Sequence, residues 1–227
     1  MQRAVGFNKV KVGIFFNVLE TVLYNSDGTR AVPQTNIYNV DESGYTVCQK
    51  PQRIVAKKGK KNVGILTSAE RGKNITVVCC VSAHGVYVPP MFIFPRMKMK
   101  PKLMDRTPAR SIGAVSKSGW INDSLFTKWF AHFIATVQPK SRPEPTVLLF
   151  DGHASHTNNL DVIEMARANN VQLIVFPSHC THRLQPLDVS VFKSINLYYD
   201  KAVATWLRDH PGRIVTEDDI GELFCTA

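Results

Sequence analysis

Three consecutive stretches decide the fold of this chain: TVLLFD at residues 146–151, NLDVIEMARANN at 159–170 and VQLIVF at 171–176. The first and third are continuous apolar runs, which are typical of strands buried on both faces of a sheet. The second has the length of a helix and ends in two asparagines, which favour the left-handed conformation that closes a helix. A strand, a helix and a strand in this order form a right-handed crossover with parallel strands. We therefore expect a parallel strand pair covered by a helix.

The first half of the chain adds strands that we expect to be antiparallel. Strands are predicted at residues 36–41, 63–67, 74–82 and 86–94. The last should lie at a sheet edge, because Pro89 and Pro90 cannot donate ladder hydrogen bonds. A helix is expected over residues 8–24, where apolar side chains recur at helical spacing: Val12, Phe15, Phe16, Leu19, Val22 and Leu23. Residues 96–122 are basic and lack periodicity, which predicts a loop.

Two further helices complete the expected fold. One is capped by Asn122 or Asp123 and runs to about Val137, with a buried stripe of Phe126, Trp129, Phe130, Phe133 and Ile134. The other begins at Pro186, a residue favoured at the first helical position, and reaches about Arg208. The order of elements predicts an α/β fold, with a mixed sheet flanked by helices.

The chain divides into three expected parts. Residues 1–30 form an N-terminal helix leading into the core, and residues 31–210 form the main domain. Residues 211–227 are the start of a truncated C-terminal segment, since Thr216-Glu217-Asp218-Asp219 is a good helix start close to the end of the sequence.

Composition favours a polyanionic partner. The chain has 227 residues, of which 44% are hydrophobic, so it can bury one sizeable core. Its formal net charge is +10, which favours nucleic acid over membrane because no basic amphipathic stretch is present. No run approaches 18 apolar residues, so we expect an intracellular protein without a membrane partner. The five cysteines include no Cys-x-x-Cys pair, which predicts reduced thiols packed as small hydrophobes.

The positive charge is concentrated in two short stretches. Residues 50–61 include Lys57, Lys58, Lys60 and Lys61, and residues 96–110 include Arg96, Lys98, Lys100 and Lys102. Movable cations of this kind bind the phosphate backbone of DNA without reading its sequence. Solvated loops are the alternative for either stretch alone, and the first could equally be a nuclear import signal. We expect the protein to act in the nucleus on DNA.

Three aspartates stand where an element changes character: Asp41, Asp151 and Asp188. The first two end predicted strands, and the third lies in the first turn of the final helix. An ionised carboxylate at the end of an apolar run needs compensation, for which a bound cation is one source. One cluster of all three would form a carboxylate cage for hard divalent metal. Two such ions about 3.5–4 Å apart would hold the attacking and leaving oxygens of a phosphoryl displacement.

A helical count predicts that Asp188 points inward. From Asp188, alternating steps of four and three residues lead along the final helix to apolar positions on one face: Phe192, Ile195, Tyr199, Ala202 and Trp206. A purely structural role remains an alternative for each acid. Asp188 would offset the helix dipole, Asp151 would cap a turn, and Asp41 would end a strand.

A zinc site competes for the same region. Its candidate ligands are His153, His156, His179, Cys180 and His182. Imidazole and thiolate suit zinc, but the spacings match no standard zinc finger. We therefore favour loop histidines close to the acidic site.

Five motifs carry a family resemblance: YNVDESG at residues 38–44, SAERG at 68–72, PPMFIFP at 89–95, LFDGHASH at 149–156 and PSHCTHRLQPLD at 177–188. With them, residues 1 to about 210 closely resemble the DDE-type endonuclease domain of pogo, Tigger and jerky transposases, to which the centromere protein B lineage is related. The resemblance implies a ribonuclease H-like fold, two Mg²⁺ or Mn²⁺ ions, and DNA strand cleavage and transfer. It makes Asp41, Asp151 and Asp188 the catalytic acids and metal ligands.

Two functions follow as hypotheses. The leading one is a metal-dependent DNA endonuclease or transposase domain. The alternative is a host-adopted DNA-binding or assembly protein that keeps the fold without the chemistry. Transposases of this family carry N-terminal helix-turn-helix domains, and no such unit is recognisable here, so we expect DNA binding with little sequence preference. The sequence leaves open whether the chain acts as a monomer or as a homo-oligomer.

Overall fold

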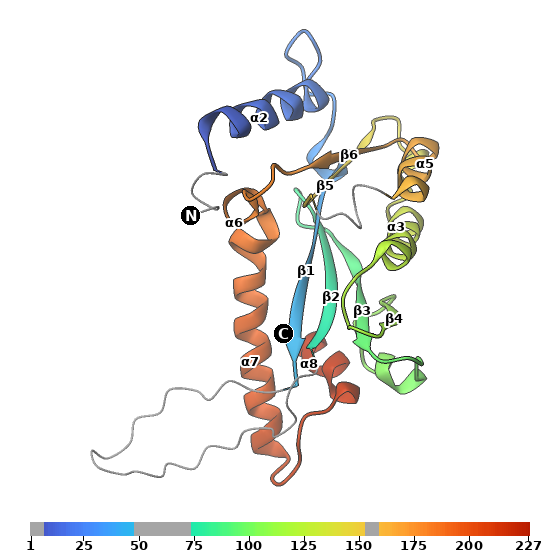
Figure 1. Cartoon of the computed structure of the whole chain (residues 1–227), viewed down its shortest axis with the longest axis vertical. Coiled ribbons are helices and arrows are strands. Elements are labelled where there is room, and N and C mark those ends of the chain that lie inside the picture. The colour runs from blue at the N-terminus through green and yellow to red at the C-terminus, as the bar shows by residue number, and fades with distance from the viewer. Residues whose placement is uncertain (1–6, 48–73, 153–158) are drawn as a thin grey trace, which may run out of the picture.

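The computed structural model describes residues 7–47, 74–152 and 159–227. A six-stranded mixed sheet runs through its centre, in the order β4-β3-β2-β1-β5-β6 (Figure 1). The strands are β1 (Ile37–Thr46), β2 (Asn74–Ser82), β3 (Tyr87–Pro95), β4 (Ile112–Ser116), β5 (Thr146–Phe150) and β6 (Val171–Val175). The predicted strand at 63–67, the lysines at 57, 58, 60 and 61, and the histidines at 153 and 156 lie outside the described residues.

The predicted crossover is confirmed. Strands β5 and β6 pair in parallel, from Thr146 opposite Val171 to Phe150 opposite Val175. Helix α5 (Leu160–Ala168) lies between them in the chain, and its N-cap Asn159 accepts a hydrogen bond from the Val162 amide. Strand β1 pairs with β5 in parallel and with β2 antiparallel, so it joins the two halves of the sheet.

The prediction that β3 lies at the sheet edge is wrong. This strand pairs with β2 on one side and, in parallel, with β4 on the other. Its prolines are accommodated by a bulge, because Val88 and Met91 pair with Cys80 and Val78 and leave Pro89 and Pro90 opposite one residue of β2. Pairing with β4 starts only at Met91, beyond the prolines.

The expectation of a loop over residues 96–122 is also wrong. This stretch contains the short helix η2 (Pro101–Met104) and strand β4. Strand β4 has only one buried residue, Ala114, and so shows no apolar period. Its strand conformation depends on hydrogen bonds to β3 rather than on a local pattern.

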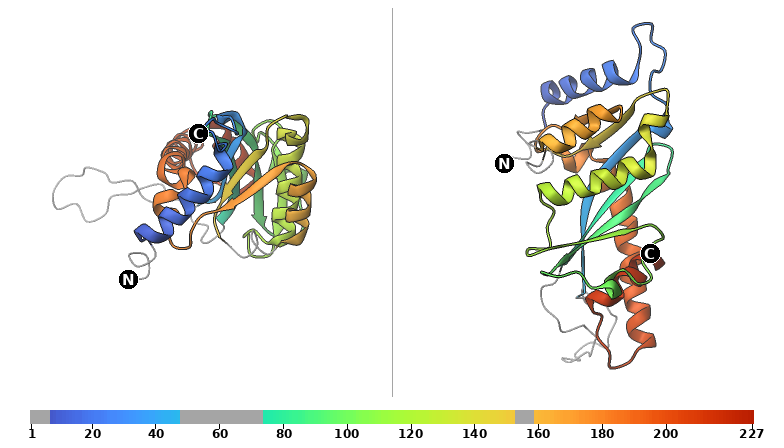
Figure 2. Two further views of the ribbon diagram at one scale, coloured as in Figure 1. Left: turned by 90° about the horizontal axis from the view of Figure 1, so that it is seen from above. Right: turned by 90° about the vertical axis from the view of Figure 1, so that its right-hand side faces the viewer.

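Helices cover both faces of the sheet (Figures 1 and 2). Helices α3 (Asp123–Val137) and α5 lie on one face. On the other face lie α2 (Lys9–Leu23), α7 (Phe192–Asp209) and α8 (Ile220–Thr226). The shorter elements are η1 (Gln34–Asn36), η3 (Pro139–Ser141), α6 (Thr181–Leu184), η4 (Leu187–Val191) and η5 (Glu217–Asp219). No helix in the described ranges has the length and apolar character needed to cross a membrane.

Most of the predicted helical stripes pack as expected. Helix α3 begins after its N-cap Asn122 and buries Phe126, Trp129, Phe130 and Phe133 against the sheet. In α2, Phe15 is buried and Leu19 packs beside it, but Phe16 is 50% exposed and so lies off the predicted face.

The C-terminal residues join the core of the second face. Val215, Ile220 and Leu223 are buried in the same cluster as Phe92 and Tyr199. Thr216 and Asp219 form the capping box that starts this segment. The four described cysteines form no disulfide; Cys79, Cys80 and Cys180 are buried, whereas Cys225 is exposed, contrary to expectation.

Candidate active site

Asp41 lies within β1, not at its end, because the strand continues to Thr46. Side chains alternate along a strand, so Asp41 shares the face of Ile37 and Tyr45. Those two belong to separate apolar clusters on the face covered by α2 and α7. Asn39, Asp41 and Ser43 stand between them and make a polar gap in an otherwise apolar face.

Asp151 follows directly after β5 and is half-buried. The parallel register sets Asn39 of β1 opposite Leu149 of β5. Asp41 stands two residues further along β1, and Asp151 two residues further along the chain, just past the end of β5; the charge of Asp151 acts on Asp41. The structure thus brings together two of the predicted acids, at the carboxyl end of the parallel strands.

Asp188 is exposed, and the prediction that it points inward along the apolar stripe is wrong. The stripe itself is confirmed, since Phe192 and Tyr199 are buried and Ile195 packs against the same cluster. Asp188 lies in η4, a π-helical turn that precedes α7. A π turn holds an extra residue, so the 3.6-residue count of α7 does not extend back through it. Leu187 is the buried residue of this turn.

The three carboxylates nevertheless act on one another electrostatically. Burial, together with the negative charges of Glu42, Asp188 and Asp151, raises the pKa of Asp41 to about 7. The Glu42 amide donates to Asp41 Oδ1 at 2.9 Å, which opposes that rise. The pKa of Asp188 is also raised, by the partial burial of its carboxyl group and by the charge of Asp151. Three carboxylates from three segments of the chain therefore repel one another, and a bound cation would offset that repulsion.

An open pocket of about 740 Å³ adjoins Asp151 and Asp188. It is lined by Asp151, Gly152, Pro177, Ser178, His179, Thr181, His182 and Asp188. The two histidines come from the loop after β6 and from α6, which agrees with the interpretation of loop histidines near the acidic site. His179 has a left-handed backbone, with φ 63°.

The side chains do not form a ready-made metal site. Within the described ranges, no three His, Cys, Asp or Glu side chains converge closely enough to hold an ion. This finding gives no support to zinc on His179, Cys180 and His182. It also means that Asp41, Asp151 and Asp188 would have to draw closer to share an ion.

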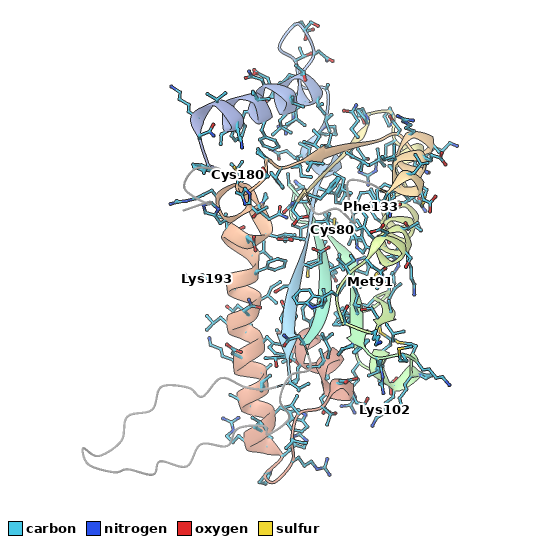
Figure 3. All side chains as sticks on the ribbon, in the orientation of Figure 1. Cys80, Met91, Lys102, Phe133, Cys180 and Lys193 are labelled. Atoms are coloured by element: carbon cyan, nitrogen blue, oxygen red, sulfur yellow. The ribbon has the colours of Figure 1, made fainter. Side chains whose placement is uncertain are left out.

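Two of the predicted DNA-binding cations are engaged in ion pairs. Lys102 Nζ lies 2.9 Å from Asp218, and Arg96 lies 3.5 Å from Glu217, which is nearly buried. Lys98 and Lys100 are exposed and form no ion pair with any described residue. Figure 3 places Lys102 at the opposite end of the molecule from Cys180, so this stretch does not adjoin the acids.

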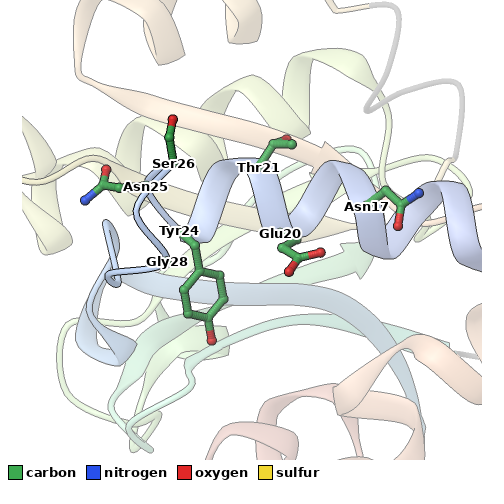
Figure 4. A pocket seen from close by; sticks show the side chains of 7 residues that line it. All are labelled: Asn17, Glu20, Thr21, Tyr24, Asn25, Ser26 and Gly28. Carbon is green, nitrogen blue, oxygen red and sulfur yellow. The ribbon is translucent and has the colours of Figure 1, made fainter.

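A second pocket, of about 630 Å³, lies at the C-terminal end of α2. Figure 4 shows its lining, which comes from the helix and the turn after it: Asn17, Glu20, Thr21, Tyr24, Asn25, Ser26 and Gly28. None of the predicted site residues contributes to it. The acidic pocket is therefore the candidate active site.

Sequence reasoning missed two residues beside the acids. Asn39 and Gln185 are buried amides that hydrogen-bond to each other. The available signal was a lone asparagine inside the apolar start of β1, two residues before Asp41.

Comparison with solved structures supports the fold. The catalytic domain of the Mos1 mariner transposase is 14% identical, with a TM-score of 0.52, and the match covers 97% of this chain and 94% of that one. The Mos1 mariner paired end complex with Mn is 15% identical with a TM-score of 0.56, covering 96% and 59%. The predicted ribonuclease H-like fold is confirmed.

The matches to proteins of similar sequence include most of this chain but only a small part of each relative. The human pogo transposable element with KRAB domain is 26% identical over 173 residues, which are 74% of this chain and 27% of that protein. The MFS-type transporter clz9 of Cochliobolus lunatus is 25% identical over 181 residues, 79% of this chain and 20% of that one. This chain thus spans less than a third of the length of these relatives. Their names describe the whole proteins and do not say what the matched segment does.

A family model decides the membership. The model described as DDE superfamily endonuclease matches residues 72–219, which is more than half of the chain and includes Asp151 and Asp188. Together with the mixed sheet and the clustered carboxylates, this match shows that the chain belongs to the DDE superfamily of endonucleases.

Proposed function

We propose that this chain is a DNA endonuclease and strand-transfer domain that cleaves phosphodiester bonds with the help of divalent metal. The observation that carries the proposal is the electrostatic interaction of Asp41, Asp151 and Asp188, three carboxylates from distant parts of the chain, two of which line one open pocket. Family membership supports the same chemistry.

Asp41, Asp151 and Asp188 would hold the metal, and we propose two ions. Carboxylate oxygens are the donors that Mg²⁺ and Mn²⁺ prefer. The raised pKa of Asp41 fits this role, since its causes are burial and neighbouring negative charge, which a cation offsets. Solved Mos1 mariner paired end complexes with Mn and with Mg support these metals.

When bound, the ions would lower the pKa of a water molecule and offset negative charge on the phosphate. The residues of the chain have complementary tasks. Asp41 must lose its proton to serve as a ligand, which its pKa of about 7 allows near neutrality. The side chains of Ser178, His179 and His182 line the pocket and can donate hydrogen bonds to phosphate oxygens. A freed 3′-hydroxyl would then attack a second strand.

DNA is the proposed substrate and partner, and the nucleus the proposed location. A Mos1 strand transfer complex and a paired-end complex with left transposon end have the same fold as this chain. A complex that pairs two DNA ends suits two copies of the protein, one for each end, so we propose a homo-oligomer.

One observation favours the alternative function. The described side chains form no ready-made metal site, as expected of a host-adopted DNA-binding or assembly protein that keeps the fold without catalysis. An assay of metal-dependent DNA cleavage distinguishes the two functions.

The purified chain should nick supercoiled plasmid in millimolar Mn²⁺ and stop when EDTA removes the metal. The measurement is conversion of supercoiled to open-circular DNA on a gel. DNA binding without any Mn²⁺-dependent nicking would contradict the proposal and support the alternative.

The unpaired cations of the 96–102 stretch should contribute to DNA affinity. Replacing Lys98 and Lys100 together by alanine should weaken duplex binding equally for two unrelated sequences. It should also reduce the slope of log affinity against log salt by about two, because each phosphate contact contributes about 0.9. Fluorescence anisotropy at several salt concentrations measures both quantities.

The matched control is Arg96→Ala with Lys102→Ala. Carboxylates already neutralise these two cations, so the salt slope should change less. A larger loss in this control than in the lysine pair would show that the ion pairs open on DNA.

A further inference from the structure

Two buried amides lie at the junction of β1, β5 and η4. Asn39 is 4% exposed and Gln185 is completely buried. Asn39 Nδ2 donates to Gln185 Oε1 at 2.5 Å and to the carbonyl of Leu149 at 3.0 Å. Gln185 Nε2 donates to the carbonyl of Val40 at 3.1 Å, and Asn39 Oδ1 accepts from the amide of Leu187, also at 3.1 Å.

Each backbone partner of this amide pair lies next to a candidate catalytic acid. Leu149 is two residues before Asp151, and Leu187 directly precedes Asp188. Val40 directly precedes Asp41, and Asn39 itself is two residues before it. Four hydrogen bonds therefore tie the strand, the strand end and the helical turn that carry the three acids.

Ordinary core packing does not require amides at this place. Buried polar groups are costly unless all of them are hydrogen-bonded, and apolar side chains fill the same face on both sides of the pair. The pair also supplies what backbone pairing cannot, since η4 is not a strand and cannot join the ladder of β1. Fully satisfied amide networks specify one relative position of the elements they join.

We propose that Asn39 and Gln185 are positioning residues, which hold the three segments carrying Asp41, Asp151 and Asp188 side by side, so that divalent metal can draw the carboxylates together. This inference rests on the proposed metal-dependent function. The amides touch neither substrate nor metal; they act through the backbone beside each acid. Partners that hydrogen-bond a metal ligand directly are worth about 10- to 100-fold in metal affinity or activity, and we expect the lower end of that range for amides that act through the backbone.

The test uses the full chain and two variants. Asn39→Leu keeps the branched shape of the side chain, and Gln185→Met keeps its length, while both lose the hydrogen bonds. Asn36→Leu is the matched control. Asn36 is 2% exposed and donates to the carbonyls of Glu144 and Pro145, so it joins β1 and β5 at their other end.

Apparent Mn²⁺ affinity is read from the rise in melting temperature with Mn²⁺ concentration, and folding from circular dichroism. Asn39→Leu and Gln185→Met should weaken Mn²⁺ binding about tenfold or more, whereas Asn36→Leu should leave it within about twofold. Nicking by the two variants should recover as Mn²⁺ is raised, with plasmid affinity unchanged. A merely structural role would not produce that recovery.

Two outcomes would overturn the inference. It fails if a folded Asn39→Leu variant binds Mn²⁺ as the unaltered chain does, or if Asn36→Leu loses as much affinity. If Asn39→Leu does not fold, Gln185→Met decides by the same criterion. If the unaltered chain itself shows no Mn²⁺-dependent stabilisation, the proposed function fails and this inference with it, which distinguishes the two failures.

Discussion

A purified Asp151→Asn chain should fold normally and lose Mn²⁺-dependent nicking by on the order of a thousandfold or more. Asparagine keeps the shape of the side chain but removes the anion that would hold the metal. Metal ions supply several kcal/mol of charge stabilisation in the transition state, and about 1.4 kcal/mol corresponds to a tenfold change in rate. The rate of plasmid nicking and the melting temperature in EDTA measure the two parts of this expectation.

Asp161→Asn provides a control close in sequence. Asp161 is exposed in the first turn of α5, away from the pocket lining. This variant should nick plasmid at the unaltered rate. Undiminished nicking by Asp151→Asn would show that Asp151 is not a metal ligand, whatever the control does.

The second large effect concerns stability without metal. In EDTA at pH 8, Asp41→Asn should be more stable than the unaltered chain, although it should be inactive. The pKa of Asp41 is about 7 in the folded chain and 3.8 in the unfolded one. Between these values the folded state holds a proton that the unfolded state has released. The free energy of unfolding therefore falls as pH rises, by about 1.4 kcal/mol per unit.

Over roughly three pH units this loss is on the order of 4 kcal/mol, and asparagine avoids it because it cannot ionise. The advantage of Asp41→Asn should thus be small near pH 4, grow up to about pH 7 and stay constant above. Saturating Mn²⁺ should reverse the order, because the metal stabilises only the chain that binds it.

Melting temperatures at pH 4.5 and 8, with EDTA and with Mn²⁺, test this prediction. Asp200→Asn, at an exposed position of α7, should change stability little under all four conditions. An Asp41→Asn chain less stable than the unaltered one in EDTA at pH 8 would contradict the half-buried environment, crowded by negative charge, assigned to this carboxyl.

The sequence predicted those parts of the fold that local pattern determines. The continuous apolar runs of β5 and β6, the length and closing asparagines of α5, and the cap at Asn122 are all local signals. The two errors in the sheet depend on distant partners. Strand β4 exists because β3 pairs with it, and the prolines of β3 are tolerated because of a bulge in its pairing with β2.

The candidate site shows the same division. Asp41, Asp151 and Asp188 were recognisable from the motifs around them, and Asp151 also from its place at the end of a strand, whereas Asp41 lies within β1 rather than at its predicted end. The burial of Asp188 was mispredicted because a π turn shifts the helical count. The ion pairs of Arg96 and Lys102 join residues more than a hundred positions apart, which no local pattern reveals.

The position of β1 between the two halves of the sheet has a consequence for biosynthesis. Its contact with β5 spans 110 residues, from Asn39 to Leu149, and its contact with η4 spans 148, from Asn39 to Leu187. Contacts of such high order form late, after the intervening chain has been made. At about 5–20 residues per second, translation from the first acid to the last takes roughly 7 to 30 seconds. Throughout that interval a nascent chain holds an incomplete set of carboxylates, and the site is assembled only when the ribosome has passed Asp188.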